Sequence, residues 1–201
     1  VLGKSMVIYR EPIREIAGMI GDMNPKPILL YDTAHVLGLI GPDFQEPFKE
    51  GADLVTGSTH KTFFGPQRGM IASNMSEGTE YEELWEAIVR RVFPGSVSNH
   101  HLGTLVGLLL AAYEMNAFKS DYQKAVIANA KAFARSLKKR GLTVEGDPRI
   151  GYTETHQVIV RVGYGKGPMM AERLEENNVI VNYQSAPDDE AFTTASCLRM
   201  G

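Results

Sequence analysis

The sequence contains a single cysteine, Cys197, among 201 residues, and an internal disulfide is therefore excluded. A lone thiol is typical of proteins from a reducing compartment, so we expect a cytoplasmic protein. The five histidines are scattered, without the paired Cys or His-x-x-x-His spacing of zinc sites, and we expect no metal site.

Long runs of positive charge and long apolar runs are also missing. Lys and Arg number 21 against 24 Asp and Glu, and the longest basic run is only Lys138-Lys139-Arg140, so we expect no nucleic-acid partner. The longest apolar stretch, 102–113, is shorter than the roughly 20 residues of a membrane span. It predicts a buried helix and no membrane partner.

The remaining composition is that of a folded protein, with 43% hydrophobic and 22% charged residues. Apolar spacing predicts a helix over 12–20, and 44–51 is expected to form a loop or short helix. Three short apolar segments predict strands, at 27–32, 53–56 and 69–73. Alternation of helix and strand indicates an α/β layer with parallel strands.

The second half of the sequence has a different texture. A helix is expected over 80–91, with Thr79 and Glu82 as a capping box and Phe93-Pro94-Gly95 as its stop. Ser120 and Asp121 are expected to cap a further long helix that ends at Gly141. Beyond it we expect a strand at 158–162, a helix at 169–177, and strands at 179–182 and 196–200. These elements predict a smaller α+β domain over 119–201, after a larger α/β domain over 1–118.

Two polar turns follow predicted strands, where ligands bind in open α/β sheets. Asp32 ends the first strand, and Lys61 lies in the segment 57–66 after the second. A crowded pocket keeps a lysine amine reactive toward a carbonyl group, and a carboxylate keeps the nitrogen of a pyridine ring protonated. Ala34 is small enough for a flat ring, and His35 could bind the ring oxygen or the substrate. The pair suits covalent carbonyl chemistry.

Four segments, in the same order, resemble motifs of the serine (glycine) hydroxymethyltransferase family, whose members are fold-type-I pyridoxal-phosphate enzymes. Segment 58–66 is similar to the family's Thr-Thr-His-Lys-Thr-Leu-x-Gly-Pro, and 32–35 to its Asp-x-Ala-His. Segment 93–95 is similar to Phe-Pro-Gly, and 198–201 to Leu-Arg-Ile-Gly. The resemblance implies an α/β fold of type I, with part of the large, mostly parallel sheet domain and a smaller C-terminal α+β domain.

The resemblance also implies roles for individual residues. Lys61 corresponds to the lysine that forms the internal aldimine with pyridoxal 5'-phosphate, and Asp32 to the partner of the ring nitrogen. Arg199 corresponds to the arginine that binds the substrate carboxylate, which a planar guanidinium does bidentately. The remaining cofactor-binding positions are Ala34, His35, Ser58, Thr59 and His60, and His35 is also a catalytic candidate.

Some family features are changed or missing. Ser96-Val97-Ser98-Asn99 stands where the family has Gln-Gly-Gly-Pro, whose backbone reaches the cofactor phosphate of the neighbouring subunit, and Gln67 stands where the family has arginine. No Ser-Gly-Ala phosphate loop or catalytic-glutamate motif precedes Asp32. We therefore expect the sequence to be a partial one that lacks the N-terminal part of the enzyme.

The resemblance implies a transferase that interconverts serine and glycine with tetrahydrofolate as the one-carbon carrier. It also implies a homodimer with shared active sites and a small amino-acid substrate. Two alternatives stay open: a related lyase, either threonine-aldolase-like or cysteine-desulfurase-like, and an inert structural or dimer-forming fragment. Cys197 is expected to be a small core residue, because no neighbouring base or helix terminus lowers its pKa.

Overall fold

The computed structural model describes residues 1–75, 78 and 81–201, and these residues form two compact units. The first unit comprises Val1–Lys4 and Glu11–Ser120, and the second comprises Ser5–Arg10 and Asp121–Gly201. The division into domains 1–118 and 119–201 stays a prediction. None of the described helices has both the length and the apolar character of a transmembrane span.

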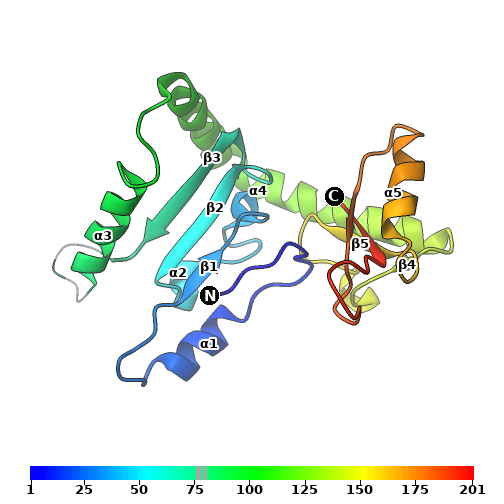
Figure 1. The fold of residues 1–201 in the computed structure, drawn as a ribbon, viewed down its shortest axis with the longest axis horizontal. Coiled ribbons are helices and arrows are strands. Elements are labelled where there is room, and N and C mark those ends of the chain that lie inside the picture. Colours follow the sequence, from blue (N-terminus) through cyan, green and yellow to red (C-terminus); the bar gives the residue numbers. More distant parts are fainter. Residues whose placement is uncertain (76–77, 79–80) are drawn as a thin grey trace. The chain divides into compact units, whose positions relative to one another are not determined.

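The first unit contains a three-stranded sheet in the order β1-β2-β3 (Figure 1). Its strands are β1 (Leu30–Asp32), β2 (Leu54–His60) and β3 (Phe64–Ser73). The helical elements around it are α1 (Ile13–Ile20), the 3-10 turn η1 (Leu37–Leu39), α2 (Pro47–Glu50) and α3 (Glu82–Val92). The first part of the long helix α4 (Leu102–Lys139) also belongs to this unit. The helix predicted over 12–20 and the first two strands are thus confirmed, although β1 is shorter and β2 longer than expected.

The third strand differs from the expected parallel arrangement. β1 pairs with β2 in parallel, with Asp32 opposite Thr56, but β2 and β3 are antiparallel. Only residues 61–63 separate the two strands, whereas a parallel crossover needs about a dozen residues or more. The segment with Lys61 is therefore the tight turn of a hairpin.

Helix α4 is continuous through the position where the sequence predicted a new helix start. Ser120 does not cap a helix; its hydroxyl donates to Asp43 Oδ2 at 3.0 Å. Serine and aspartate are poor helix formers, but on an exposed face of a long helix they cost only a few tenths of a kcal/mol. The predicted end before Gly141, which has φ 87°, is confirmed.

The expectation that 102–113 is a buried helix is wrong for this chain. Leu102, Leu110 and Tyr113 are 61% to 71% exposed. Gly107 and Leu108 lie beside Pro66 and Gly65 of the β2–β3 hairpin, and farther along the helix Ala111 and Met115 are buried. The pattern predicted the helix correctly, but an apolar run does not say which polypeptide covers it.

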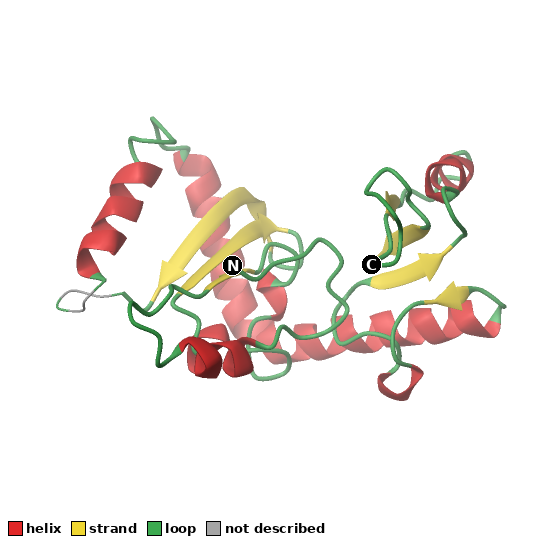
Figure 2. Cartoon of the chain, turned by 60° about the horizontal axis from the view of Figure 1, so that its bottom comes forward, coloured by secondary structure: helices red, strands yellow, loops and turns green. Residues whose placement is uncertain are grey.

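The second unit contains a four-stranded antiparallel sheet in the order β4-β5-β7-β6 (Figure 2). Its elements are β4 (Thr143–Val144), the 3-10 turn η2 (Pro148–Ile150), β5 (Val158–Arg161), α5 (Gly167–Glu175), β6 (Asn182–Gln184) and β7 (Cys197–Met200). The predicted strand at 179–182 lies instead at 182–184, and Ile180 is 84% exposed. The helix at 169–177 and the strands at 158–162 and 196–200 are confirmed to within two residues.

The two faces of this second sheet are covered differently. Ala130 and Ala134 of α4 pack against Val158 and Val160 of β5. On the opposite face Ile159 and Cys197 pack together, and segment 5–10 covers them. Cys197 is fully buried, as the sequence predicted.

Helix α3 begins two residues after the predicted start, at Glu82, and ends before Phe93-Pro94-Gly95 as expected. Thr79, the expected partner of Glu82 in the capping box, lies outside the described residues. The Glu82 carboxylate accepts a hydrogen bond of 2.8 Å from the Gly78 N–H.

Candidate functional site

The Asp32 turn is fixed by hydrogen bonds to its own backbone and to β2. Asp32 Oδ1 accepts a hydrogen bond of 2.9 Å from the Ala34 N–H. Both the N–H and the hydroxyl of Thr33, a fully buried residue, donate to the Thr56 carbonyl at 2.8 Å. The carboxylate of Asp32 is exposed on this rigid support, at the carboxyl end of a parallel strand.

The turn that carries Lys61 is held from within the hairpin. Thr59 is buried, and its hydroxyl donates to the Pro66 carbonyl at 2.7 Å and lies 3.0 Å from the Arg68 carbonyl oxygen. The pairing of β2 with β3 also shifts in register between Ser58 and His60. Lys61 is exposed and forms no hydrogen bond or ion pair with any described residue. The Lys61 amine is therefore not held in place by any described side chain or carbonyl group.

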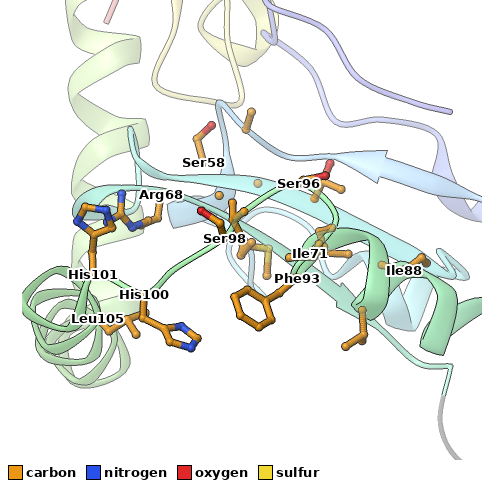
Figure 3. Close-up of a pocket in the computed structure, with 18 of the residues that line it drawn as sticks. Ser58, Arg68, Ile71, Ile88, Phe93, Ser96, Ser98, His100, His101 and Leu105 are labelled. Carbon is orange, nitrogen blue, oxygen red and sulfur yellow. The ribbon is translucent and has the colours of Figure 1, made fainter.

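A hollow of about 1070 Å³ lies between the hairpin, helix α3 and the segment that leads into α4 (Figure 3). Three residues that the sequence singled out line it: Asp32, Ala34 and Ser58. His35, Thr59, His60 and Lys61 are not part of its lining. Helix α3 contributes the apolar side chains of Trp85 and Ile88 to the lining, and β3 contributes Met70 and Ile71.

The lining also contains basic and polar residues that sequence reasoning left out of the site. Arg68, His100 and His101 are drawn toward one end of the hollow in Figure 3, and Ile88 toward the other. The ring of His100 stacks on that of Phe93, with centroids 5.3 Å apart. The available signal was the position of both histidines between the Phe-Pro-Gly segment and the start of helix α4.

Arg199 lies in β7 of the second unit, half-buried, beside segment 5–10 and β6. Its guanidinium donates to the Ser5 carbonyl at 2.9 Å and to Asn182 Oδ1 at 2.8 Å. Burial lowers its pKa below the usual arginine range, and no carboxylate among the described residues pairs with it. The side chain is held by neutral oxygen atoms, so its positive charge is not neutralised.

Two further titratable side chains, Tyr31 of β1 and Cys197 of β7, are buried. Tyr31 is 1% exposed, and burial, with smaller effects of Glu11 and Glu50, raises the pKa of its phenol. Burial also raises the pKa of the Cys197 thiol, which makes that thiol a poor nucleophile. Among the residues that the structure describes, no group of three or more His, Cys, Asp or Glu side chains is arranged for a metal ion.

Comparison with known families gives one match that extends over nearly the whole chain. The model of serine hydroxymethyltransferase matches residues 5–201. The chain belongs to the serine hydroxymethyltransferase family. This confirms the family resemblance that the four motifs carried.

Curated relatives agree with this family. The serine hydroxymethyltransferase of Archaeoglobus fulgidus is 48% identical over 100% of this chain, and that of Pyrobaculum aerophilum is 44% identical, also over 100%. The match covers 44% and 45% of these two proteins. The chain thus spans less than half the length of the curated relatives that it matches.

A solved structure supports the fold. The chain is similar to the crystal structure of L-threonine transaldolase from Pseudomonas fluorescens in its internal aldimine state, with a TM-score of 0.83 and 32% identity. The similarity covers 98% of this chain and 43% of the other. The fold class expected from the sequence, an α/β pyridoxal-phosphate fold of type I, is confirmed.

The residues around Asp32 suit the ring of pyridoxal phosphate. A carboxylate, the methyl group of Ala34 and the bare backbone of Gly57 and Gly69 line the same hollow. A Cβ on Gly57 would lie 3.0 Å from a methyl carbon of Leu37 and 3.0 Å from the Thr33 hydroxyl, closer than an ordinary contact, so the position favours glycine. The donor set thus offers a partner for a protonated ring nitrogen and space for a planar group.

Proposed function

We propose that the protein containing this chain is a pyridoxal-phosphate-dependent hydroxymethyltransferase that interconverts serine and glycine, with tetrahydrofolate as the one-carbon carrier. The observation that carries the proposal is the pair of Asp32 and Lys61. Asp32 ends β1 and Lys61 directly follows β2, the strand that pairs with β1 in parallel. The lysine amine is exposed and bound by no described residue. Membership of the serine hydroxymethyltransferase family supports the same activity.

Each candidate residue then has a stated role. Lys61 would hold the cofactor through Nζ, and Asp32 would bind its ring nitrogen. Arg199 would bind the carboxylate of the amino acid with two parallel hydrogen bonds. The other residues proposed to hold the cofactor are Ala34, His35, Ser58, Thr59 and His60. When bound, pyridoxal phosphate supplies an electron sink for the carbanion of the amino acid.

The main test uses the absorbance of lysine-bound pyridoxal phosphate. The full-length protein should show a band near the visible edge, and borohydride reduction followed by peptide mass spectrometry should locate the label on Lys61. Lys61→Ala should lose both signals, because the amine proposed to hold the cofactor is removed. Lys49→Ala is the matched control, since Lys49 is an exposed lysine paired with Glu46 at 2.7 Å. A reducible label that persists in Lys61→Ala would refute the assignment.

The structural similarity to an L-threonine transaldolase favours a second candidate, an aldolase-like enzyme that cleaves a β-hydroxy amino acid without a folate carrier. Exchange of the glycine α-proton separates the two, because only the transferase should show exchange that tetrahydrofolate accelerates. A desulfurase is disfavoured, since the thiol of Cys197 is fully buried.

The proposal includes a homodimer with shared active sites, a cytoplasmic location and no nucleic-acid or membrane partner. The exposed apolar side chains of the first part of α4 support an interface with further polypeptide, because contiguous apolar surface of this kind is rare on a monomer. The alternative of an inert fragment predicts that the isolated 201 residues bind no pyridoxal phosphate.

A further inference from the structure

We propose that Thr62 is a positioning residue that fixes the Lys61 turn against the Asp32 turn. The inference rests on the proposed function, in which Lys61 and Asp32 act on the same cofactor. Thr62 directly follows Lys61 in the hairpin turn and is 6% exposed. It belongs to no part of the hollow's lining, and its side chain points into the fold.

The Thr62 hydroxyl joins the two turns in both directions. Its Oγ1 donates to the His35 carbonyl at 2.9 Å and accepts a hydrogen bond of 3.1 Å from the Gly38 N–H. The two partners are 27 and 24 residues away in sequence, in the segment 33–38 that follows Asp32. We call these two hydrogen bonds the Thr62 bridge. Through it, the backbone that follows Asp32 is tied to the backbone that follows Lys61.

The close approach of Gly38 fixes the same contact independently of the hydroxyl. A Cβ on Gly38 would lie 2.1 Å from the Thr62 carbonyl oxygen and 2.5 Å from the Phe63 nitrogen. Backbone atoms cannot yield as a flexible side chain can, so only glycine is tolerated in this buried position. The 3-10 turn η1 thus packs directly on the peptide that follows Thr62.

This arrangement matters because Lys61 has no anchor of its own. Its amine is engaged by no described residue, so the location of its Cα depends on the turn. Catalytic groups lose rate steeply when they are displaced, by about 100-fold for a 1 Å shift. The Thr62 bridge therefore sets where the lysine amine stands relative to the carboxylate of Asp32.

The test compares three variants of the full-length protein. Thr62→Val keeps the shape and removes both hydrogen bonds, Thr62→Ser keeps the hydroxyl, and Thr143→Val is a control at an exposed position of β4. For Thr62→Val we expect kcat to fall about tenfold with a nearly unchanged KM for the amino acid. Borohydride trapping of the cofactor on Lys61 should slow by a similar factor. Thr62→Ser and Thr143→Val should match the wild type.

A second readout does not need the cofactor. Hydrogen–deuterium exchange of the cofactor-free protein should be faster in Thr62→Val at 33–39 and 61–65, and unchanged in the second unit. If exchange in these segments stays at the wild-type rate, or if Thr62→Ser is as impaired as Thr62→Val, the inference is overturned. A wild-type protein that takes up no pyridoxal phosphate on Lys61 would instead refute the proposed function, and exchange would still decide whether the Thr62 bridge exists.

Discussion

Two arginines of the C-terminal sheet lie on neighbouring strands and have opposite surroundings. Arg161 of β5 binds two carboxylates, with Nε 2.6 Å from Glu145 Oε1 and Nη2 2.8 Å from Asp188 Oδ1. These hydrogen bonds, first that to Asp188, raise the pKa of its guanidinium. Among the described residues, Arg199 of β7 donates hydrogen bonds only to the amide oxygen of Asn182 and the carbonyl of Ser5, and burial lowers its pKa.

The difference separates a structural arginine from one that is ready for a ligand. A guanidinium that already binds two carboxylates gains little from a third, whereas one held by neutral oxygens still carries an uncompensated charge. The neutral partners fix the orientation of the planar group without neutralising it. Sequence alone gives both residues the same charge, and only their partners distinguish them.

The largest expected effect comes from removing the unneutralised charge. Arg199→Gln should lower kcat/KM for serine by about 100-fold or more, because a carboxylate bound by a charge-assisted pair loses its partner. The folded state should be little affected, since no carboxylate of the described residues depends on Arg199. Steady-state kinetics measure the first expectation and thermal unfolding the second.

Arg161→Gln is the matched control for that experiment, since it removes the same group from the same sheet. It should leave kcat/KM nearly unchanged. Equal losses of activity in the two variants would contradict the distinction between the two arginines.

A smaller effect is expected from the neutral partner of Arg199. Asn182→Ala removes the acceptor at 2.8 Å and leaves the charge in place, so the orientation of the guanidinium is less restricted. We expect KM for the amino acid to rise about fivefold, the effect of one modest hydrogen bond, with kcat preserved. Asn177→Ala is the control, because the exposed Asn177 side chain donates to the backbone carbonyl of Arg173 and has no contact with Arg199 that the described residues show. An unchanged KM would show that Asn182 does not orient Arg199.

The sequence predicted the strand ends that carry Asp32 and Lys61 better than the surfaces around them. Asp32 and Lys61 could be placed at strand ends because short apolar runs and turn residues mark those ends locally. The antiparallel direction of β3 was missed, because the predicted strands ended at 56 and began at 69 and so left room for a crossover between them. The strands are longer than their apolar cores, and only residues 61–63 separate them. The contact of Thr62 with His35 and Gly38 could not be predicted either, because it depends on backbone packing between segments more than 20 residues apart.

For helix α4, the sequence predicted the secondary structure but not the burial. Its apolar first part predicted a helix correctly and burial incorrectly, and Leu102 is 71% exposed. Hydrophobic pattern reports how much apolar surface must be covered in the complete assembly, not whether this chain covers it. The polar pair Ser120 and Asp121 resembled a helix cap, yet exposure lets both residues continue the helix at small cost.

The smallest expected effect concerns the pH dependence of stability at Arg161. Hydrogen bonds from Arg161 hold the pKa of the Asp188 carboxyl below its usual range. Because the pKa is lower in the folded state, the stabilisation is present above the unfolded-state value of about 3.9 and is lost as the pH falls through the folded-state value. Arg161→Met should therefore lower the midpoint of thermal unfolding by a few degrees at pH 7, and the difference from the wild type should shrink as the pH approaches about 3. Arg90→Met removes an exposed ion pair with Glu86 in α3. It should change neither the midpoint of thermal unfolding at pH 7 nor the pH dependence of that midpoint. A constant difference across this pH range would mean that Arg161 stabilises the sheet through packing of its aliphatic stem and not through its charge.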